Sequence, residues 1–219
     1  MTALPLSSRL RGDTRSLHTQ AERSGVMAHL LRGHMSLESY GALIVALHAI
    51  YEALEQGLER NAAHPVIAAM RHPGLARASA LASDVAVLRR LGCAPLDAVE
   101  AAQSYAAHLR AVATDDPVRL IAHAWLRYLG DLNGGRVLER VVREKLGVPA
   151  GAMSFYRFPA LADPAAAAVS WRLALDRLEL GEQVESGIVD EACDGFRRHI
   201  ALFEALAGAQ DAAEVSLEA

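Results

Sequence analysis

Apolar residues recur every three to four positions through most of this chain, which is the spacing of an amphipathic α-helix. The strict alternation of apolar and polar residues that marks half-buried strands is missing. Ser7 or Ser8 can cap a first helix that runs to about Ser24, where Gly25 provides a stop. Ser36 caps a long second helix, whose apolar residues form one broad stripe. The pattern therefore opens with two helices and no strand.

Prolines and glycines divide the remainder of the chain into further helical segments. The predicted helices are one after the breakers Pro65, Pro73 and Gly74 that ends near Leu91, one from about Leu96 to Ala113, one from Pro117 to Lys145 with Asp116 as its N-cap, and two at about Pro164–Leu180 and Glu182–Leu206. No internal repeat, low-complexity tract or interdomain linker occurs. We therefore predict a single all-α domain over residues 1–207, followed by a polar tail, 208–219, that we expect to be disordered.

Composition and charge narrow the classes of partner. The chain has 219 residues, of which 52% are apolar, and a formal charge of −4, so no positive field would attract nucleic acid or an anionic membrane. The longest mostly apolar stretch, Tyr40–Leu54, is shorter than the roughly 20 residues of a membrane span and contains His48. Cys93 and Cys193 form no CxxC pair. We expect a cytoplasmic protein with no nucleic-acid or membrane partner.

The segment from Pro117 to Lys145 contains glycines that a helix disfavours. Each interior glycine costs about 1 kcal/mol relative to alanine, so Gly130, Gly134 and Gly135 together cost about 3 kcal/mol. Gly130 and Gly134 are four residues apart and make one bare strip, against which either another helix or a flat ligand could lie. Asp131, beside the strip, favours the ligand, although with Arg127 it could form a plain surface ion pair.

A histidine in the first predicted helix has the neighbours of a metal ligand. His18 and Glu22 are four residues apart, so the carboxylate can accept a hydrogen bond from one imidazole nitrogen and leave the other to bind a metal. Arg11 and Arg15 share the face of His18 and can pair with carboxylates of a ligand. His48 and His123, in apolar helices, compete with His18 on burial alone, so the spacing by itself leaves the ligand open.

Four segments together carry a family resemblance. They are LHTQAE at 17–22, HAIYEALEQGLERN at 48–61, AHAWLRYLGDLNGG at 122–135 and FRRHIALFEAL at 196–206. With these in their order and spacing, the chain resembles the biliverdin-producing heme oxygenase family over about residues 8–207. The resemblance implies a helical fold in which heme lies between the first helix and a glycine-kinked distal helix.

The resemblance also implies a role for each matched residue. His18 would be the proximal iron ligand, and Glu22 would orient it. Asp131 would anchor ordered water on the distal side. The other implied site residues are Tyr51 and Arg127 in the water network, Gly130 and Gly134 against the heme face, Arg11, Arg15 and Arg172 at the propionates, and Phe196 in the pocket wall. Departures are Trp125 where many relatives have tyrosine near a propionate, Ala168 where some have a lysine, and Asn133 for a frequent serine. These departures leave the regiospecificity open.

The implied reaction consumes heme, O2 and electrons and yields biliverdin, CO and Fe(II), so heme is both cofactor and substrate. Electrons would come from a separate reductase or ferredoxin, because the chain has no GxGxxG fingerprint. Iron release and supply of a bilin chromophore to an accepting protein both fit the reaction.

Three other readings compete with it. A non-catalytic heme carrier or sensor would keep the pocket, but has no evident need for Asp131, Tyr51 and Arg127. A di-iron oxidase would need Glu-x-x-His pairs, and the sequence has none. A helical enzyme of the thiaminase type lacks a supporting cysteine and carboxylate motif here.

Overall fold

The computed structural model describes residues 4–217, and the side chains of residues 4–209. Helices and short 3-10 turns are the regular elements of the described chain, which contains no strand, so the all-α prediction is confirmed. The helices are α1 (Leu6–Asp13), α2 (Arg15–Glu22), α3 (Gly25–Arg32), α4 (Leu37–Arg60), α5 (Pro65–Met70), α6 (Ala78–Arg90), α7 (Glu100–Asp115), α8 (Leu120–Lys145), α9 (Pro164–Leu175) and α10 (Glu182–Leu217).

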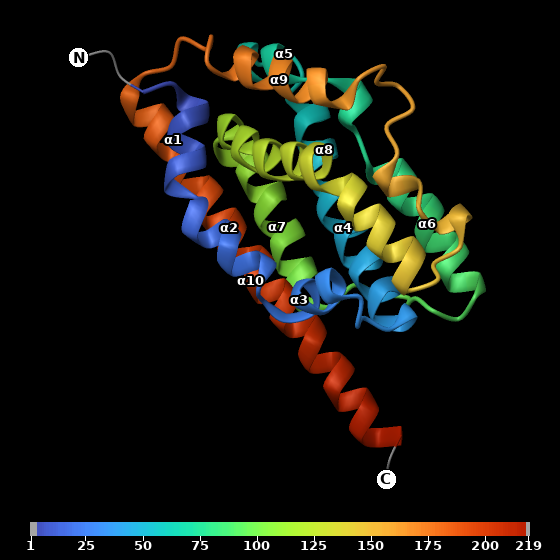
Figure 1. Ribbon diagram of the computed structural model, residues 1–219. Helices are drawn as coiled ribbons and strands as arrows, with labels where there is room; N and C mark the ends of the chain where they lie inside the picture. The colour runs from blue at the N-terminus through green and yellow to red at the C-terminus, as the bar shows by residue number, and fades with distance from the viewer. Residues whose placement is uncertain (1–3, 218–219) are drawn as a thin grey trace.

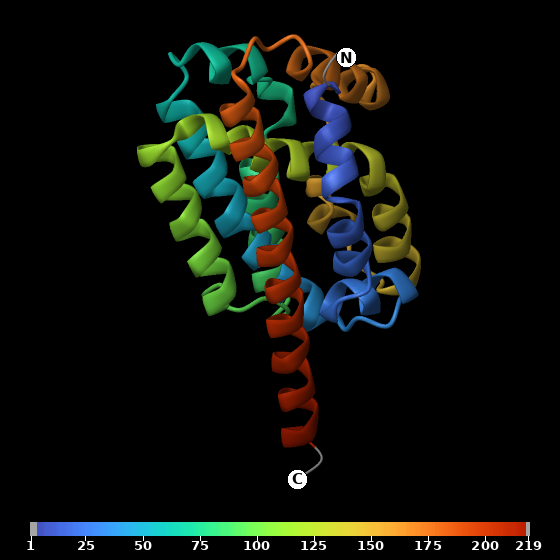
Figure 2. The same ribbon diagram turned by 90° about the vertical axis from the view of Figure 1, so that its left-hand side faces the viewer.

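The helices pack around two long ones. The helix α4 packs mainly on α6 and α7, and α10 packs on α8 and on the N-terminal helices α2 and α3. In Figure 1, α1 and α2 follow α10 along one side of the molecule, and the C-terminal part of α10 extends beyond the body. Figure 2, turned by 90°, shows the same projection of α10. The arrangement brings α2 and α8, which are distant in sequence, to two walls of one cavity.

The predicted helix after Ser36 is the core helix of the fold. Ser36 caps it as predicted, with its side-chain oxygen accepting a hydrogen bond from the backbone N–H of Ser39 at 3.1 Å. This α4 is long and apolar enough to cross a membrane by length and composition, but 61% of its most apolar window is buried inside the protein. Burying a Leu or Ile side chain contributes about 1.5–3 kcal/mol, and Ile44, Ile50 and Leu54 are all fully buried. The apolar stripe of α4 therefore packs against the other helices of the protein.

The prediction of one continuous first helix is wrong, because the segment forms two helices, α1 and α2. The break lies at Thr14, whose hydroxyl donates to the carbonyl of Leu10 at 2.6 Å, a bond that bends helices. The predicted caps are also wrong, because Pro5 precedes the first turn and the Ser7 backbone N–H donates to Asp176 at 2.8 Å. The predicted stop at Gly25 is also wrong, because α2 ends at Glu22 with Arg23 as its C-cap, and Gly25, at a φ of 42°, is the first residue of α3.

Other helix ends also differ from the prediction. Asp116 does not cap through its side chain, which instead accepts from the Arg119 guanidinium at 3.0 Å, and a 3-10 turn precedes α8. Pro65 starts the short helix α5 instead of only breaking the chain. The helix α9 ends at Leu175, five residues early, and α10 continues to Leu217 instead of ending near Leu206. The expected tail 208–219 thus starts inside α10, and residues 218–219 lie outside the described part.

The loop between α8 and α9 is anchored by one buried carboxylate. Asp84 of α6 is fully buried and accepts from the backbone N–H groups of Ser154 and Phe155, both at 2.8 Å. Burial raises the pKa of Asp84, and the two backbone bonds act in the opposite direction. The contact holds two 3-10 turns, Ala150–Ala152 and Ser154–Tyr156, against α6.

Candidate functional site

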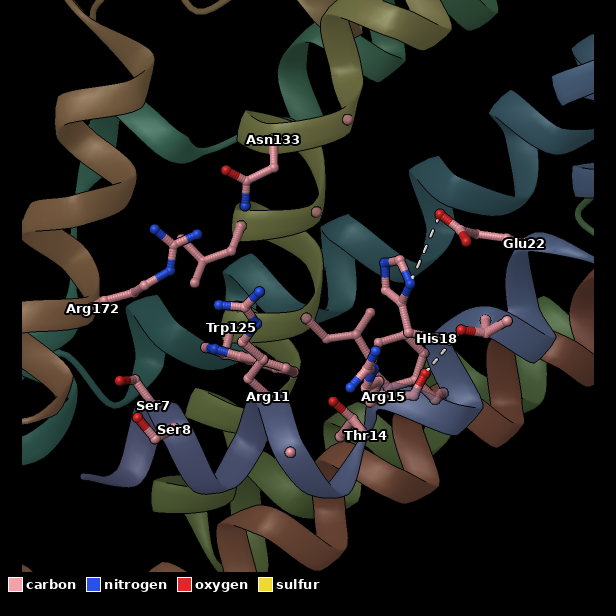
Figure 3. A pocket seen from close by; sticks show the side chains of 17 residues that line it. Ser7, Ser8, Arg11, Thr14, Arg15, His18, Glu22, Trp125, Asn133 and Arg172 are labelled. Carbon is pink, nitrogen blue, oxygen red and sulfur yellow. Dashed lines mark hydrogen bonds and ion pairs between the residues drawn. The ribbon is translucent and has the colours of Figure 1, made fainter. Parts of the chain in front are cut away.

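A cavity of about 1160 Å³ lies between the N-terminal helices and α8. Its walls come from α1 and α2 on one side and α8 on the other, with single contributions from α9 and α10 (Figure 3). Of the residues predicted for the site, those that line the cavity are Arg11, Arg15, His18, Glu22, Trp125, Gly130, Gly134, Arg172 and Phe196. Helices distant in sequence thus bring these predicted residues to one space.

His18 projects from α2 into the cavity, and its side chain is 56% exposed (Figure 3). Its Nδ1 lies 3.8 Å from the Glu22 Oε1, so the two groups are in contact, but the expected hydrogen bond is not formed. The ring of Phe196 meets the imidazole edge-on, with 5.7 Å between ring centroids. Phe196 in turn packs edge-on to Trp125 at 6.5 Å. The aromatic side chains therefore support the imidazole without covering its open side.

The two glycines of the bare strip have no neighbours on their open face. Among the described residues, a Cβ added at Gly130 or at Gly134 would meet no atom within 4 Å apart from its chain neighbours and the backbone of its own helix, and both residues border the cavity. Close packing of another helix, the alternative explanation for these glycines, is therefore excluded. Gly135 differs, because it is buried and a Cβ there would lie 4.0 Å from Tyr156. The helix α8 changes direction along its length (Figure 1), which interior glycines permit.

Three arginines surround the cavity without a protein anion to balance them. Arg11 and Arg15 extend from the N-terminal helices, and Arg172 extends from α9 (Figure 3). Among the described residues, none of the three makes an ion pair or a hydrogen bond with a carboxylate. Guanidinium groups pair strongly with carboxylates, so the cavity is suited to an anionic ligand.

Asp131, Tyr51 and Arg127 form a hydrogen-bonded group behind the glycine strip and do not line the cavity. The Tyr51 hydroxyl donates to Asp131, and Arg127 donates to the Tyr51 oxygen at 3.0 Å and to Asp131 at 3.3 Å. The Asp131 side chain is only 9% exposed. Burial raises the pKa of Asp131, and the positive charge of Arg127 acts against that increase. The group therefore holds one carboxylate in a fixed, nearly dry position.

The next member of this group is His199 of α10, which is not among the residues predicted for the site. Arg127 donates to its Nε2 at 3.0 Å, and its Nδ1 donates to the carbonyl of Gly195 at 2.8 Å. Burial, and then the charge of Arg127, lowers the pKa of His199 well below its ordinary value. The apolar spacing of FRRHIALFEAL places position 199 on the buried face, which was the available signal.

The competing histidines do not reach the cavity. His123 is fully buried, where its ring nitrogens bond to Tyr105 at 2.8 Å and to Glu191 at 2.9 Å. His48 belongs to α4 and is absent from the lining. Of the histidines considered as metal ligands, His18 is therefore the one that faces the cavity.

The sequence of this chain is similar to those of known heme oxygenases. Residues 4–205 match the family model described as heme oxygenase. The chain is 35% identical over 205 residues to the heme oxygenase of Takifugu rubripes, an alignment that covers 92% of this chain and 74% of that one. It is 31% identical to heme oxygenase 1 of Synechocystis sp., covering 93% and 85% of the two chains.

A solved structure shows the same fold. The crystal structure of heme oxygenase-1 from Synechocystis sp. PCC6803 in complex with heme superposes with a TM-score of 0.89 at 30% identity, covering 98% of this chain and 97% of that one. The matched family region includes both walls of the cavity and the whole of the Asp131 group. On these grounds, the chain belongs to the heme oxygenase family.

Proposed function

We propose that this chain is a heme oxygenase, which cleaves heme with O2 and electrons and releases biliverdin, CO and Fe(II). The observation that carries the proposal is the cavity itself, with an imidazole from α2, a side-chain-free strip of α8, and three arginines that lack protein anions. A heme has an iron, which the imidazole can bind, a flat ring, which can lie against the side-chain-free strip, and two propionates, which the arginines can pair with. The similarity to heme oxygenases over nearly the whole chain does not favour the alternative function, a non-catalytic heme carrier.

The cavity residues would each hold one part of the heme. His18 would bind the iron, with Glu22 close enough to orient the imidazole after a small rotation from 3.8 Å. Arg11, Arg15 and Arg172 would pair with the propionates and so set which edge of the ring faces the site of oxidation. Bound heme supplies the iron at which O2 is reduced, and its own ring is the substrate.

The Asp131 group would manage water and protons at the opposite face. Asp131 is fixed by Tyr51 and Arg127, so its carboxylate can orient a water molecule at the glycine strip without moving. A carboxylate with a raised pKa also exchanges a proton with water more readily near neutral pH than an ordinary one. The bare strip allows this water and the ligand to approach the α8 backbone closely.

Several parts of the proposal concern partners. The electrons would come from a reductase or ferredoxin, and the product would serve iron release or pass to a bilin-accepting protein, in the cytoplasm. The absence of a dinucleotide fingerprint in the sequence supports a separate electron donor.

The proposal is tested by adding hemin to the purified chain and then ascorbate in air. We expect stoichiometric uptake, followed by loss of the Soret band and appearance of biliverdin, whose isomer is read by chromatography. A Soret band that persists under turnover would instead indicate the carrier. The variant His18→Ala should lose the histidine-ligated spectrum, and added imidazole should restore it. Unchanged heme binding by His18→Ala would refute the assignment of the iron ligand.

Asp131→Asn separates the chemistry from binding. The amide keeps the size of the side chain but removes the charge that Arg127 balances, so we expect heme uptake close to that of the parent and a biliverdin yield reduced about 10²-fold or more. Asp97→Asn is the matched control, because it makes the same change at an exposed residue that does not line the cavity, and it should retain full yield. A normal biliverdin yield from Asp131→Asn would remove this carboxylate from the mechanism.

A further inference from the structure

A second cluster of metal-ligand residues lies outside the cavity, where α7, α8 and α10 meet. It consists of His108 from α7, His123 from α8 and Glu191 from α10, whose ligand atoms all lie within 4.8 Å of one another. The Glu191 Oε1 is 2.6 Å from the His108 Nε2 and 2.9 Å from the His123 Nε2. Asp194, one turn further along α10, has an oxygen 3.6 Å from the same His108 nitrogen.

We propose that His108, His123 and Glu191 bind one divalent transition-metal ion, with Asp194 as a fourth ligand on the solvent side. Two imidazoles and one or two carboxylates form a borderline donor set, which suits Zn²⁺, Fe²⁺ and their neighbours better than Mg²⁺ or Ca²⁺. None of the four residues borders the cavity, and the proposal does not rest on the heme chemistry.

The spacing of the ligand atoms is close to that of an occupied site. Metal–nitrogen and metal–oxygen bonds of about 2.0–2.2 Å place the ligand atoms of a tetrahedral site roughly 3.3–3.5 Å apart. The Glu191 oxygen lies 2.6 and 2.9 Å from the two imidazole nitrogens, so each of these separations must lengthen by less than about 1 Å, which side-chain rotations can provide. Asp194, whose oxygen is 3.6 Å from the His108 nitrogen, lies outside the group of atoms within 4.8 Å of one another and would have to turn toward the ion. The ion would take the place of two imidazole protons, those of His108 and His123, which now both point at the Glu191 Oε1.

A bound cation needs both imidazole nitrogens of the cluster free of protons. The Nε2 atoms of His108 and His123 now both face the Glu191 Oε1, so their protons must leave or move before an ion can bind. For the His123 Nε2 to bind a metal, the proton of this imidazole must reside on Nδ1, whose N–H can donate a hydrogen bond to the Tyr105 oxygen 2.8 Å away.

The cluster opens to solvent on one side. The His108 side chain is 25% exposed and that of Asp194 is 39% exposed, whereas Glu191 and His123 are buried. Two arginines now share the carboxylates, with Arg119 3.7 Å from Glu191 and Arg198 donating to Asp194 at 2.6 Å. Both guanidinium groups reach solvent, so an arriving ion can displace them.

The test is a calorimetric titration of the full-length, heme-free chain with Zn²⁺, accompanied by the visible spectrum of the Co²⁺ form. We expect one site per chain. His108→Ala and Glu191→Gln should lower its affinity at least tenfold, and Tyr105→Phe should lower it about 10- to 100-fold through the orientation of His123. His34→Ala, which removes an exposed histidine elsewhere, and His18→Ala, which removes the cavity imidazole, should leave the site intact.

His108 is partly exposed, so its variant should fold; circular dichroism checks the fold of each protein, and hemin uptake checks it for every variant other than His18→Ala. Equal Zn²⁺ affinity in the parent, His108→Ala and Glu191→Gln would overturn the proposal. Loss of the site in His18→Ala alone would also overturn it, because the ion would then belong to the cavity. Failure of the heme proposal would appear separately, in hemin uptake by the parent protein.

Discussion

Gly130 and Gly134 allow a prediction in which stability and ligand binding change in opposite directions. A Cβ at either position meets no atom within 4 Å, and neither residue has a positive φ, so alanine fits the helix of the heme-free protein. Alanine is favoured over glycine in a helix interior by about 1 kcal/mol. In a protein of this size that gain corresponds to a melting temperature about 2–4 °C higher. We therefore expect Gly134→Ala to be more stable than the parent without heme.

The same methyl group would occupy the face against which heme is proposed to lie. Overpacking by one such group costs about 1–3 kcal/mol, which converts to heme affinity about 5- to 150-fold weaker. The assay pairs thermal unfolding of the heme-free protein, followed by circular dichroism, with a hemin titration followed at the Soret band. Gly130→Ala should behave in the same way.

Gly208→Ala is the matched control, because Gly208 is an exposed glycine of α10 with no atom within 4 Å of an added Cβ and no place in the cavity lining. It should gain stability similarly and keep the parental heme affinity. A destabilised Gly134→Ala protein would show that the open face in this structure is wrong. A stabilised variant with unchanged heme affinity would show that heme does not lie against the strip.

Two further predictions concern buried groups outside the cavity. Asp84→Asn presents an amide to the backbone N–H groups of Ser154 and Phe155, so the free energy of unfolding should fall by about 2–3 kcal/mol in a urea titration; an unchanged midpoint would contradict the anchoring role. His199 has a lowered pKa in the folded protein, so the unfolded chain binds more protons below pH 6.5 and acid favours unfolding. The stability of the parent relative to His199→Asn should therefore fall by up to about 1.4 kcal/mol per pH unit between pH 6.5 and 5. A pH-independent difference between these two proteins would argue against a buried, neutral His199.

Helix content followed from local patterns, and so it could be predicted from the sequence. The cap at Ser36 and the apolar stripe after it depend on residues within one helix, and α4 begins where they indicate. The break at Thr14 could not be predicted in this way. It accompanies a side-chain bond within the helix and a contact between Ser7 and Asp176, which lie 169 residues apart. The cap predicted at Ser7 was misplaced because its backbone N–H is taken by this distant contact.

For the site, the sequence by itself determined which chemical groups are available and which of them share a helix. The four-residue spacings of His18 with Glu22 and of Gly130 with Gly134 set a common face within each helix. Only the tertiary structure decided that these two faces border the same cavity, that Tyr51 of α4 bonds Asp131, and that α10 supplies the buried His199. The physical reason is that periodicity orients side chains about their own helix axis, whereas contacts between helices depend on how the axes pack, and packing is set by the whole core.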